Sequence, residues 1–260
     1  MLSGGTETML SRLSAFFLFI VLLSAGIASA DPMKQTEDLS GSFVIPYGDG
    51  DPAAGSFTFS YRYPCIDDSE PDANAVNSFY RDLVETDETN MVFFADGYAE
   101  LGISVIKDIS YRVTCNNDDY FCALMIQHLT IGDSDRLIWE GHVFSRKSGA
   151  LGTTVDLPRL LNLLDEAEQD EYLLERQSEK ASEVVIEMML NMIDANPERI
   201  PYYYDTITYE YLLDTVFPEN DFYLDENGDP VFFVNPGVIA DESLGYLLFP
   251  IPLADIEEEL

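Results

Sequence analysis

The sequence predicts an α+β fold, with one or more antiparallel sheets and two central helices packed on them. Apolar and polar residues alternate in much of the first half, and apolar residues recur at helical spacing between residues 157 and 193. Strand-like patterns return in the last forty residues. Because strands and helices do not alternate one by one, a parallel βαβ chain is excluded. We expect an N-terminal and a C-terminal module that form one compact unit.

Residues 1–30 carry the pattern of a secretory signal peptide. Arg12 precedes an uncharged apolar run, residues 13–27, and Ala28-Ser29-Ala30 follows directly before Asp31. The run is shorter than the roughly 20 residues of a membrane-spanning helix, and no basic segment follows it. We expect cleavage after Ala30 and a secreted or cell-surface location. A retained N-terminal anchor is the alternative.

The N-terminal module is expected at residues 56–150, after a linker at residues 31–55. The linker segment is rich in Gly, Pro, Asp and Ser, and the alternative there is a loosely held first strand at residues 43–45. The module begins with an alternating strand over 56–64, and a short helical pattern starts at Pro71. The remaining strands are expected at 97–115 and 121–131, joined as a hairpin by polar residues 116–119, and around 136–145.

The C-terminal module is expected at residues 151–260. Asp156 is well placed as the N-cap of a helix over 157–164. A second helix follows, because Leu174, Ser178, Ala181, Val185, Met188 and Met192 have the spacing of one helix face. Asn227-Gly228 predicts a tight hairpin turn with positive φ at both residues. A last strand covers 245–251.

The chain is strongly acidic. Its 13 Lys+Arg stand against 48 Asp+Glu, a formal net charge of −35. This balance excludes binding to a nucleic-acid backbone or to an anionic membrane surface. It would steer a cationic partner toward the protein, although solubility alone also explains an acidic surface. With only 2 His and 3 Cys, the chain offers few metal ligands, and we expect neither a metal nor another cofactor.

No residue is assigned a catalytic role. His142, in Trp139-Glu140-Gly141-His142, could be paired with a carboxylate as a general base, and His128 lies on the preceding expected strand. No serine or cysteine nucleophile motif accompanies either histidine. A structural role for His142 is therefore favoured. The methionines at 188, 189 and 192 either line an adaptable groove or fill the core.

The last forty residues resemble a bacterial family with no assigned chemistry. The resemblance rests on Phe222-Tyr223-Leu224, Gly228, Val231-Phe232-Phe233, Pro236, Ile239-Ala240, Gly245 and Ile251-Pro252. That family forms the extracellular part of RsiV-type anti-sigma factors and occurs in stand-alone secreted proteins. Residues 144–157 resemble a second segment of the same proteins. Residues 57–145 resemble the neighbouring module of RsiV-type proteins and the non-catalytic N-terminal region of the PdaC deacetylase.

This resemblance implies a receptor-like, non-catalytic binding protein. In RsiV-type proteins the domain recognises lysozyme, which is small and very basic. The implied partner is therefore a basic, lysozyme-like protein or a cell-wall component such as peptidoglycan. The alternative class is a cell-wall polymer hydrolase, or a deacetylase-associated module, that uses paired carboxylates; among 48 acidic residues the sequence selects no pair.

The segment from Asn235 to Leu244 is the candidate recognition loop. It begins with Asn235, Pro236 and Gly237 and presents Asp241 and Glu242 where a cationic partner could meet them. It also departs from the resembling family, whose members tend to carry tyrosines there. Structural packing of a chain crossing is the alternative.

A disulfide is predicted between Cys115 and Cys122. The two residues flank the polar tip of the expected hairpin and would face each other across its strands. Export would provide the oxidising environment that the bond requires, and closing so short a loop contributes roughly 2.5 kcal/mol. Cys65 is then left as a buried thiol. Its bonding to a hairpin cysteine, or three reduced thiols, are the alternatives.

Overall fold

The computed structural model describes residues 32–48, 55–71, 73–146, 154–165, 168, 170–195, 203–204 and 207–260. Asp31–Leu260 form one compact unit, as expected for two joined modules. The expected signal peptide lies outside the described residues. Within the described ranges, no helix is both long and apolar enough to cross a membrane.

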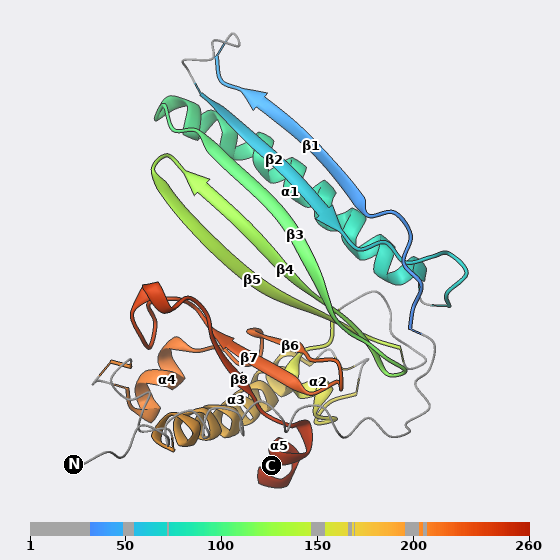
Figure 1. Cartoon of the computed structure of the whole chain (residues 1–260), viewed down its shortest axis with the longest axis vertical. Coiled ribbons are helices and arrows are strands. Elements are labelled where there is room, and N and C mark those ends of the chain that lie inside the picture. The colour runs from blue at the N-terminus through green and yellow to red at the C-terminus, as the bar shows by residue number, and fades with distance from the viewer. Residues whose placement is uncertain are drawn as a thin grey trace, which may run out of the picture. The chain divides into compact units, whose positions relative to one another are not determined.

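The N-terminal half forms a five-stranded sheet whose strands lie in chain order (Figure 1). Its strands are β1 (Leu39–Pro46), β2 (Ser56–Tyr63), β3 (Val105–Asn116), β4 (Tyr120–Ile131) and β5 (Ser134–Ser145). Neighbouring strands are antiparallel except β2 and β3, which are parallel. Parallel neighbours need a long crossover, and helix α1 (Ala73–Glu100) supplies it.

Two expectations about this half need correction. The strand expected from residue 97 starts only at Val105, because α1 continues to Glu100 and ends before Gly102, whose φ is +64°. The expected linker at 31–55 contains β1, which pairs with β2 along its whole length. The alternative of a first strand is therefore confirmed, and this strand is longer than residues 43–45.

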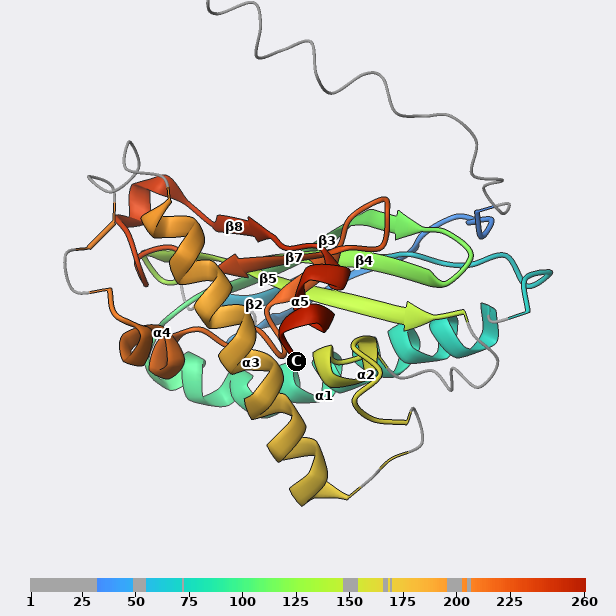
Figure 2. The ribbon, with the colours of Figure 1, turned by 90° about the horizontal axis from the view of Figure 1, so that it is seen from below.

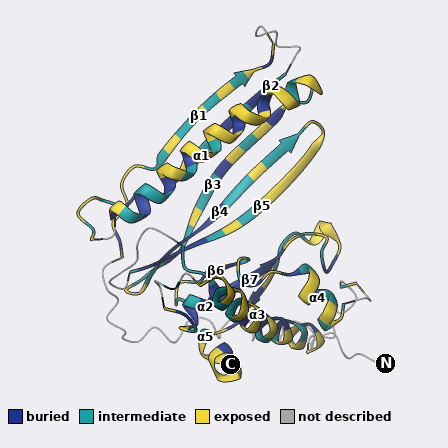
Figure 3. Cartoon of the chain, turned by 180° about the vertical axis from the view of Figure 1, so that it is seen from behind, coloured by how far each residue is buried: buried dark blue, intermediate teal, exposed yellow. Residues whose placement is uncertain are grey.

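Helix α1 packs on one face of the five-stranded sheet. Its buried residues include Val76, Tyr80 and Met91, and Figure 3 shows buried positions along one side of the helix and exposed ones along the other. Buried Asn77 fixes the start of the helix, because its side-chain amide donates to the Ile66 carbonyl and accepts from the Ile66 N–H. The aromatic side chains of β2 complete this core.

The C-terminal half forms a second, three-stranded antiparallel sheet of β6 (Phe222–Leu224), β7 (Pro230–Val234) and β8 (Leu247–Pro250). Its helices are α2 (Leu157–Leu160), α3 (Glu171–Asp194), α4 (Tyr209–Thr215), the short 3-10 helix η3 (Glu242–Leu244) and α5 (Leu253–Glu259). Figure 2 shows α3 running across this half with α5 beside it. The expected α+β class, with helices between two sets of strands, is confirmed.

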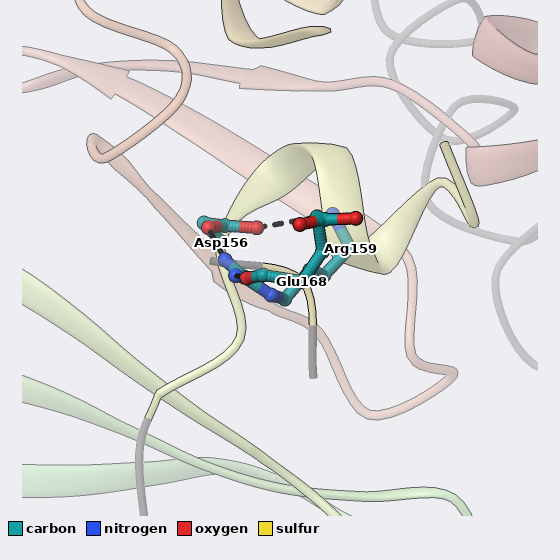
Figure 4. A network of polar contacts seen from close by, with 3 residues as sticks. All are labelled: Asp156, Arg159 and Glu168. Atoms are coloured by element: carbon teal, nitrogen blue, oxygen red, sulfur yellow. Dashed lines mark hydrogen bonds and ion pairs between the residues drawn. The ribbon is translucent and has the colours of Figure 1, made fainter. Parts of the chain in front are cut away.

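Asp156 caps α2, as expected. Its carboxylate accepts from the Arg159 N–H at 3.0 Å and forms an ion pair with the Arg159 guanidinium, which also donates to the Glu168 carbonyl at 2.6 Å (Figure 4). The helix spans four residues instead of the expected eight, because Asn162 adopts a positive φ of 54°. The leucines beyond it, Leu161 and Leu164, are nevertheless buried.

The hairpin of β6 and β7 is confirmed, but its turn is not the two-residue turn that Asn227-Gly228 predicts. Gly228 has a positive φ of 91°, whereas Asn227 does not. Asp225 instead organises a five-residue loop, since its Oδ1 accepts from the N–H groups of Asn227 and Asp229. Hydrogen bonds from the loop backbone to the Asp225 side chain hold this longer loop in place. The loop therefore does not adopt the two-residue turn, which needs a positive φ at both of its residues.

Strands β4 and β5 separate two hydrophobic cores. Phe121, Ala123 and Met125 of β4 face the core under α1, whereas Cys122 and Leu124 face the core of the C-terminal half. Gly141 of β5 lies directly against β6, where a Cβ atom would come within 1.7 Å of the Phe222 carbonyl oxygen. Only glycine allows this approach between the two halves.

Candidate functional site

The candidate recognition loop connects β7 to β8 and is partly anchored. Gly237 has a positive φ of 81°, and the Val238 carbonyl accepts a hydrogen bond from the Tyr211 hydroxyl at 2.6 Å. Ile239 and Ala240 are buried. The middle of the loop therefore belongs to the core, and its two ends are available to solvent.

The five residues proposed in this loop play different parts. Asn235 and Gly237 are exposed and Pro236 is half-buried. Asp241 is exposed but caps η3, since its carboxylate accepts from the Ser243 N–H at 2.9 Å, and this bonding lowers the pKa of Asp241. Glu242 is exposed and makes no such bond. Recognition of a partner by this loop stays a prediction. Of its two carboxylates, that of Glu242 is the one that does not cap η3.

Cys115 and Cys122 are register partners on β3 and β4, as the expected pairing requires. Paired residues in an antiparallel ladder have Cα atoms about 4.5–5.5 Å apart, within the range of a disulfide. Both thiols are free and buried in the structure, and Cys65 is half-buried. Burial raises the pKa of Cys115 to about 12 and that of Cys122 to about 11. The disulfide itself stays a prediction.

His142 lines a small cavity of about 120 Å³ between α1 and the sheet. The imidazole is only 3% exposed and packs against Phe79 and Tyr80 at ring-centroid distances of 5.1 and 5.7 Å. Its Nε2 lies 3.0 Å from Oε1 of Glu140, yet neither ring nitrogen has hydrogen-bond geometry with a described residue. Packing against two rings agrees with the structural role favoured above.

Two further charged residues line this cavity, and sequence reasoning missed both. Lys107 Nζ lies 2.5 Å from Oδ1 of Asp87, and the two side chains are about four-fifths buried. Asp87 is on α1 and Lys107 is on β3. The two residues meet because α1, which is longer than the sequence predicts, packs along the sheet. The nearby His142 lowers the pKa of Glu140. No described group of three or more His, Cys, Asp or Glu side chains could hold a metal ion.

Two hollows flank helix α3. The first, of about 490 Å³, lies between the C-terminal half of α3 and the segment that joins β8 to α5. We call it the α3–α5 groove. Its apolar lining is formed by Val184, Met188, Met192, Ala195, Pro250, Ile251 and Pro252. Its polar lining is Asn191 together with the carboxylates of Glu187, Asp255 and Glu259.

The second hollow, also of about 490 Å³, lies between α3 and the segment around α4; we call it the α3–α4 hollow. Four glutamates line it: Glu175, Glu179, Glu183 and Glu219. The Glu219 carboxylate accepts a hydrogen bond from the Ser182 hydroxyl at 2.9 Å. No lysine or arginine is found among the described residues that line either hollow.

A pattern in the sequence accounts for this acidity. Glutamates recur at every fourth position of α3, at residues 171, 175, 179, 183 and 187. Like charges four residues apart lie on one side of a helix and destabilise it by about 0.2–0.5 kcal/mol a pair. The apolar spacing predicted this helix, but its charged face was missed although the same fourfold spacing was readable.

Comparisons with known proteins bear on the fold. No protein-family model matches the sequence, and neither does any curated protein. Among solved structures, the chain is similar to a DUF3298 family member from Bacteroides fragilis, with a TM-score of 0.54 and 14% identity over 88% of this chain and 94% of that chain. A DUF3298 family protein from Pseudomonas aeruginosa has a TM-score of 0.47 and 14% identity over 86% of this chain and 92% of that chain.

The similarity to the Bacteroides fragilis protein shows a shared fold. DUF3298 denotes a domain of unknown function, which agrees with the expected likeness to a family without assigned chemistry. The finer resemblance to RsiV-type ectodomains and to the PdaC deacetylase stays a prediction.

Proposed function

We propose that this chain is an exported, non-catalytic binding protein that recognises a basic protein, such as lysozyme, or a cell-wall component at the bacterial surface. One observation carries the proposal. The two large hollows on either side of α3 are lined by seven carboxylates, and the described residues lining them include no cation. A cationic partner would complement this surface.

Electrostatics favours such a partner in two ways. The formal charge of −35 attracts a basic protein over a distance and raises the rate of encounter. At contact, the clustered glutamates of α3 are relieved of their mutual repulsion. The resemblance to RsiV-type ectodomains supports the same class of partner.

The alternative, a hydrolase with paired carboxylates, has one observation in its favour. Asp87 and Glu140 line the same cavity as His142. However, Asp87 is paired with Lys107, and the pKa of Glu140 is lowered. A glycosidase needs one carboxyl group with a raised pKa to protonate the leaving oxygen, and Glu140 does not fit that role.

The test is a pull-down with the protein purified from the exported fraction, whose intact mass should correspond to a chain that begins at Asp31. We expect retention of lysozyme and loss of retention when the lysines of lysozyme are succinylated. Isolated peptidoglycan is tested separately by co-sedimentation. Equal retention of native and succinylated lysozyme, or binding of neither lysozyme nor peptidoglycan, would refute the proposal.

A matched pair of variants locates the interaction. Glu179→Gln/Glu183→Gln removes two charges from the α3–α4 hollow. Glu85→Gln/Glu88→Gln, here called the α1 control, removes two charges from exposed positions of α1. Only the first variant should weaken retention.

A further inference from the structure

We infer that the α3–α5 groove docks an amphipathic, cationic helix presented by the basic partner. The inference rests on the proposed function and adds where the partner binds and which kind of segment it inserts. It starts from the width of the apolar face of α3.

Helix α3 has more apolar surface than its core contact uses. Ala181, Val185, Met189 and Ile193, spaced four residues apart, are buried against the core. A second stripe with the same spacing lies one residue before Val185, Met189 and Ile193: Val184, Met188 and Met192. These three side chains are only partly covered, and Met192 is 38% exposed.

The short helix α5 forms the opposite wall. Ile256 is its one fully buried side chain, and the partly buried Leu253 and Leu260 also pack against the core. The Leu253 N–H donates to Oδ1 of Asp229 at 3.0 Å. The Lys180 ammonium donates to the carbonyl of Leu260 at 3.0 Å, which ties α3 to the end of this segment. With Pro250, Ile251 and Pro252, the two helices enclose an apolar floor between acidic edges.

The length of the groove along α3 corresponds to about three turns of a helix. Its lining residues on α3 and at the C-cap of this helix run from Val184 to Ala195, at positions i, i+3, i+4, i+7, i+8 and i+11. At about 1.5 Å per residue this stretch is roughly 16 Å long, or about three turns. Grooves of this kind accept the apolar face of an amphipathic helix through anchors at i, i+3 or i+4, and i+7.

The composition of the groove selects a cationic helix. Glu187, Asp255 and Glu259 would face lysines or arginines beside the apolar anchors. A second copy of this chain, with its charge of −35, and an anionic membrane would both be repelled. Methionine side chains are flexible and polarisable, so they adapt to anchors of different shape.

The probe is a synthetic amphipathic helix of leucine and lysine, about 18 residues long. The control peptide has the same composition with leucine and lysine alternating, so that no helix face is apolar. Binding to the exported protein is measured by calorimetry. The helical peptide should bind at least about tenfold more tightly than the alternating one. Equal affinity for both peptides would overturn the inference, because charge alone would then explain binding.

Variants place the peptide on the protein. Met188→Gln/Met192→Gln keeps side-chain length and helix propensity but removes the apolar stripe, and it should weaken peptide binding about tenfold or more. Phe93→Gln replaces the 77% exposed phenylalanine of α1 and should change nothing. If Phe93→Gln weakens binding and the methionine variant does not, the exposed face of α1 is the site and the inference is wrong.

The same variants separate this inference from the proposed function. If lysozyme binds the methionine variant as tightly as it binds the unaltered protein, the groove assignment fails while the proposed function stands. If the unaltered protein binds neither lysozyme nor peptidoglycan, both fail. Circular dichroism confirms that each variant is folded. Light scattering detects self-association: a dimer that is lost in the methionine variant would identify a second copy as the occupant and overturn the inference.

Discussion

At the residue scale, Gly141 controls the contact between the two halves of the protein. The carbonyl oxygen of Phe222 occupies the place where a side chain would begin. We predict that Gly141→Ala lowers the free energy of unfolding by about 3 kcal/mol or more, because β5 and β6 must move apart. Urea denaturation measures the change.

The matched control is Gly97→Ala in α1, where a Cβ atom would meet nothing within 4 Å. Because alanine favours a helix more than glycine does, the free energy of unfolding of this variant should rise by about 0.5–1 kcal/mol. A Gly141→Ala variant that unfolds at the same urea concentration as the unaltered protein would contradict the close contact.

The raised pKa of Asp221, the residue before β6, leads us to expect a pH dependence of stability. Burial, with Glu219 and Glu140 nearby, raises its pKa to about 6. Well below its ordinary pKa of 3.8, the group is neutral in both the folded and the unfolded state. Between pH 4 and 6 the unfolded chain loses the proton first, so stability falls as the pH rises.

Asp221→Asn mimics the protonated carboxyl group and should remove this loss. At pH 7 we expect the free energy of unfolding to rise by about 1 kcal/mol. This is less than the change in pKa alone implies, because the side chain is partly exposed to solvent. Chemical denaturation between pH 3.5 and 7.5 measures it. The exposed Asp214→Asn on α4 removes the same charge and serves as control; an equal gain in both variants would show that net charge, and not the site of Asp221, is responsible.

The cysteine pair gives a third prediction. Register pairing of Cys115 with Cys122 leads us to expect a peptide linked through these residues in non-reducing mapping of the exported protein. Without the bond, both thiols should react slowly with iodoacetamide, because burial raises their pKa values. A peptide linked through Cys65, or three readily alkylated thiols, would show that the pairing is wrong.

At the element scale, the recognition loop can be tested by replacing two charges. Asp241→Asn keeps the cap of η3, since asparagine caps as well as aspartate, and Glu242→Gln removes the freer carboxylate. The double variant should bind a basic partner with a slower on-rate and a weaker dependence on salt. Rates equal to those of the α1 control, measured by surface plasmon resonance, would remove the loop from the binding surface.

The elements show what sequence patterns capture. Strand β2 and helix α3 were predicted because each has one buried face, so apolar residues recur with the period of the element. Strand β4 is buried on both faces, and it was predicted as a long apolar run between turn signals. The length of α1 was missed because Val92, Phe93 and Phe94 are exposed and break the helical pattern. The turn after β6 was missed because the Asp225 side chain, and not the Asn227-Gly228 backbone, sets its geometry.

The candidate sites depended on long-range contacts that no pattern reveals. Trp139 of β5 stacks on Tyr246 at a centroid distance of 4.1 Å, and the Tyr246 hydroxyl bonds the β5 backbone at both Leu137 and Trp139. More than a hundred residues separate these partners. The α3–α5 groove also depends on a long-range contact. The sequence singled out its methionines, but not the segment from Pro250 to Glu259 that forms the opposite wall.

At the scale of the whole molecule, charge is the property that links fold to function. An excess of acidic residues weakens a folded protein through self-repulsion, and α3 adds local repulsion between glutamates four residues apart. A cationic partner would relieve both. The fold shared with the Bacteroides fragilis protein provides the scaffold, and the acidic hollows around α3 provide the surface on which our proposal depends.

The salt dependence of lysozyme binding tests this account most directly. Calorimetry at about 50 and 200 mM salt should show affinity falling about tenfold for the unaltered protein and for the α1 control. For Glu179→Gln/Glu183→Gln, affinity should be lower at 50 mM and should fall less with salt. Affinity that does not respond to salt, or an α1 control that weakens as much as the α3 variant, would contradict the account.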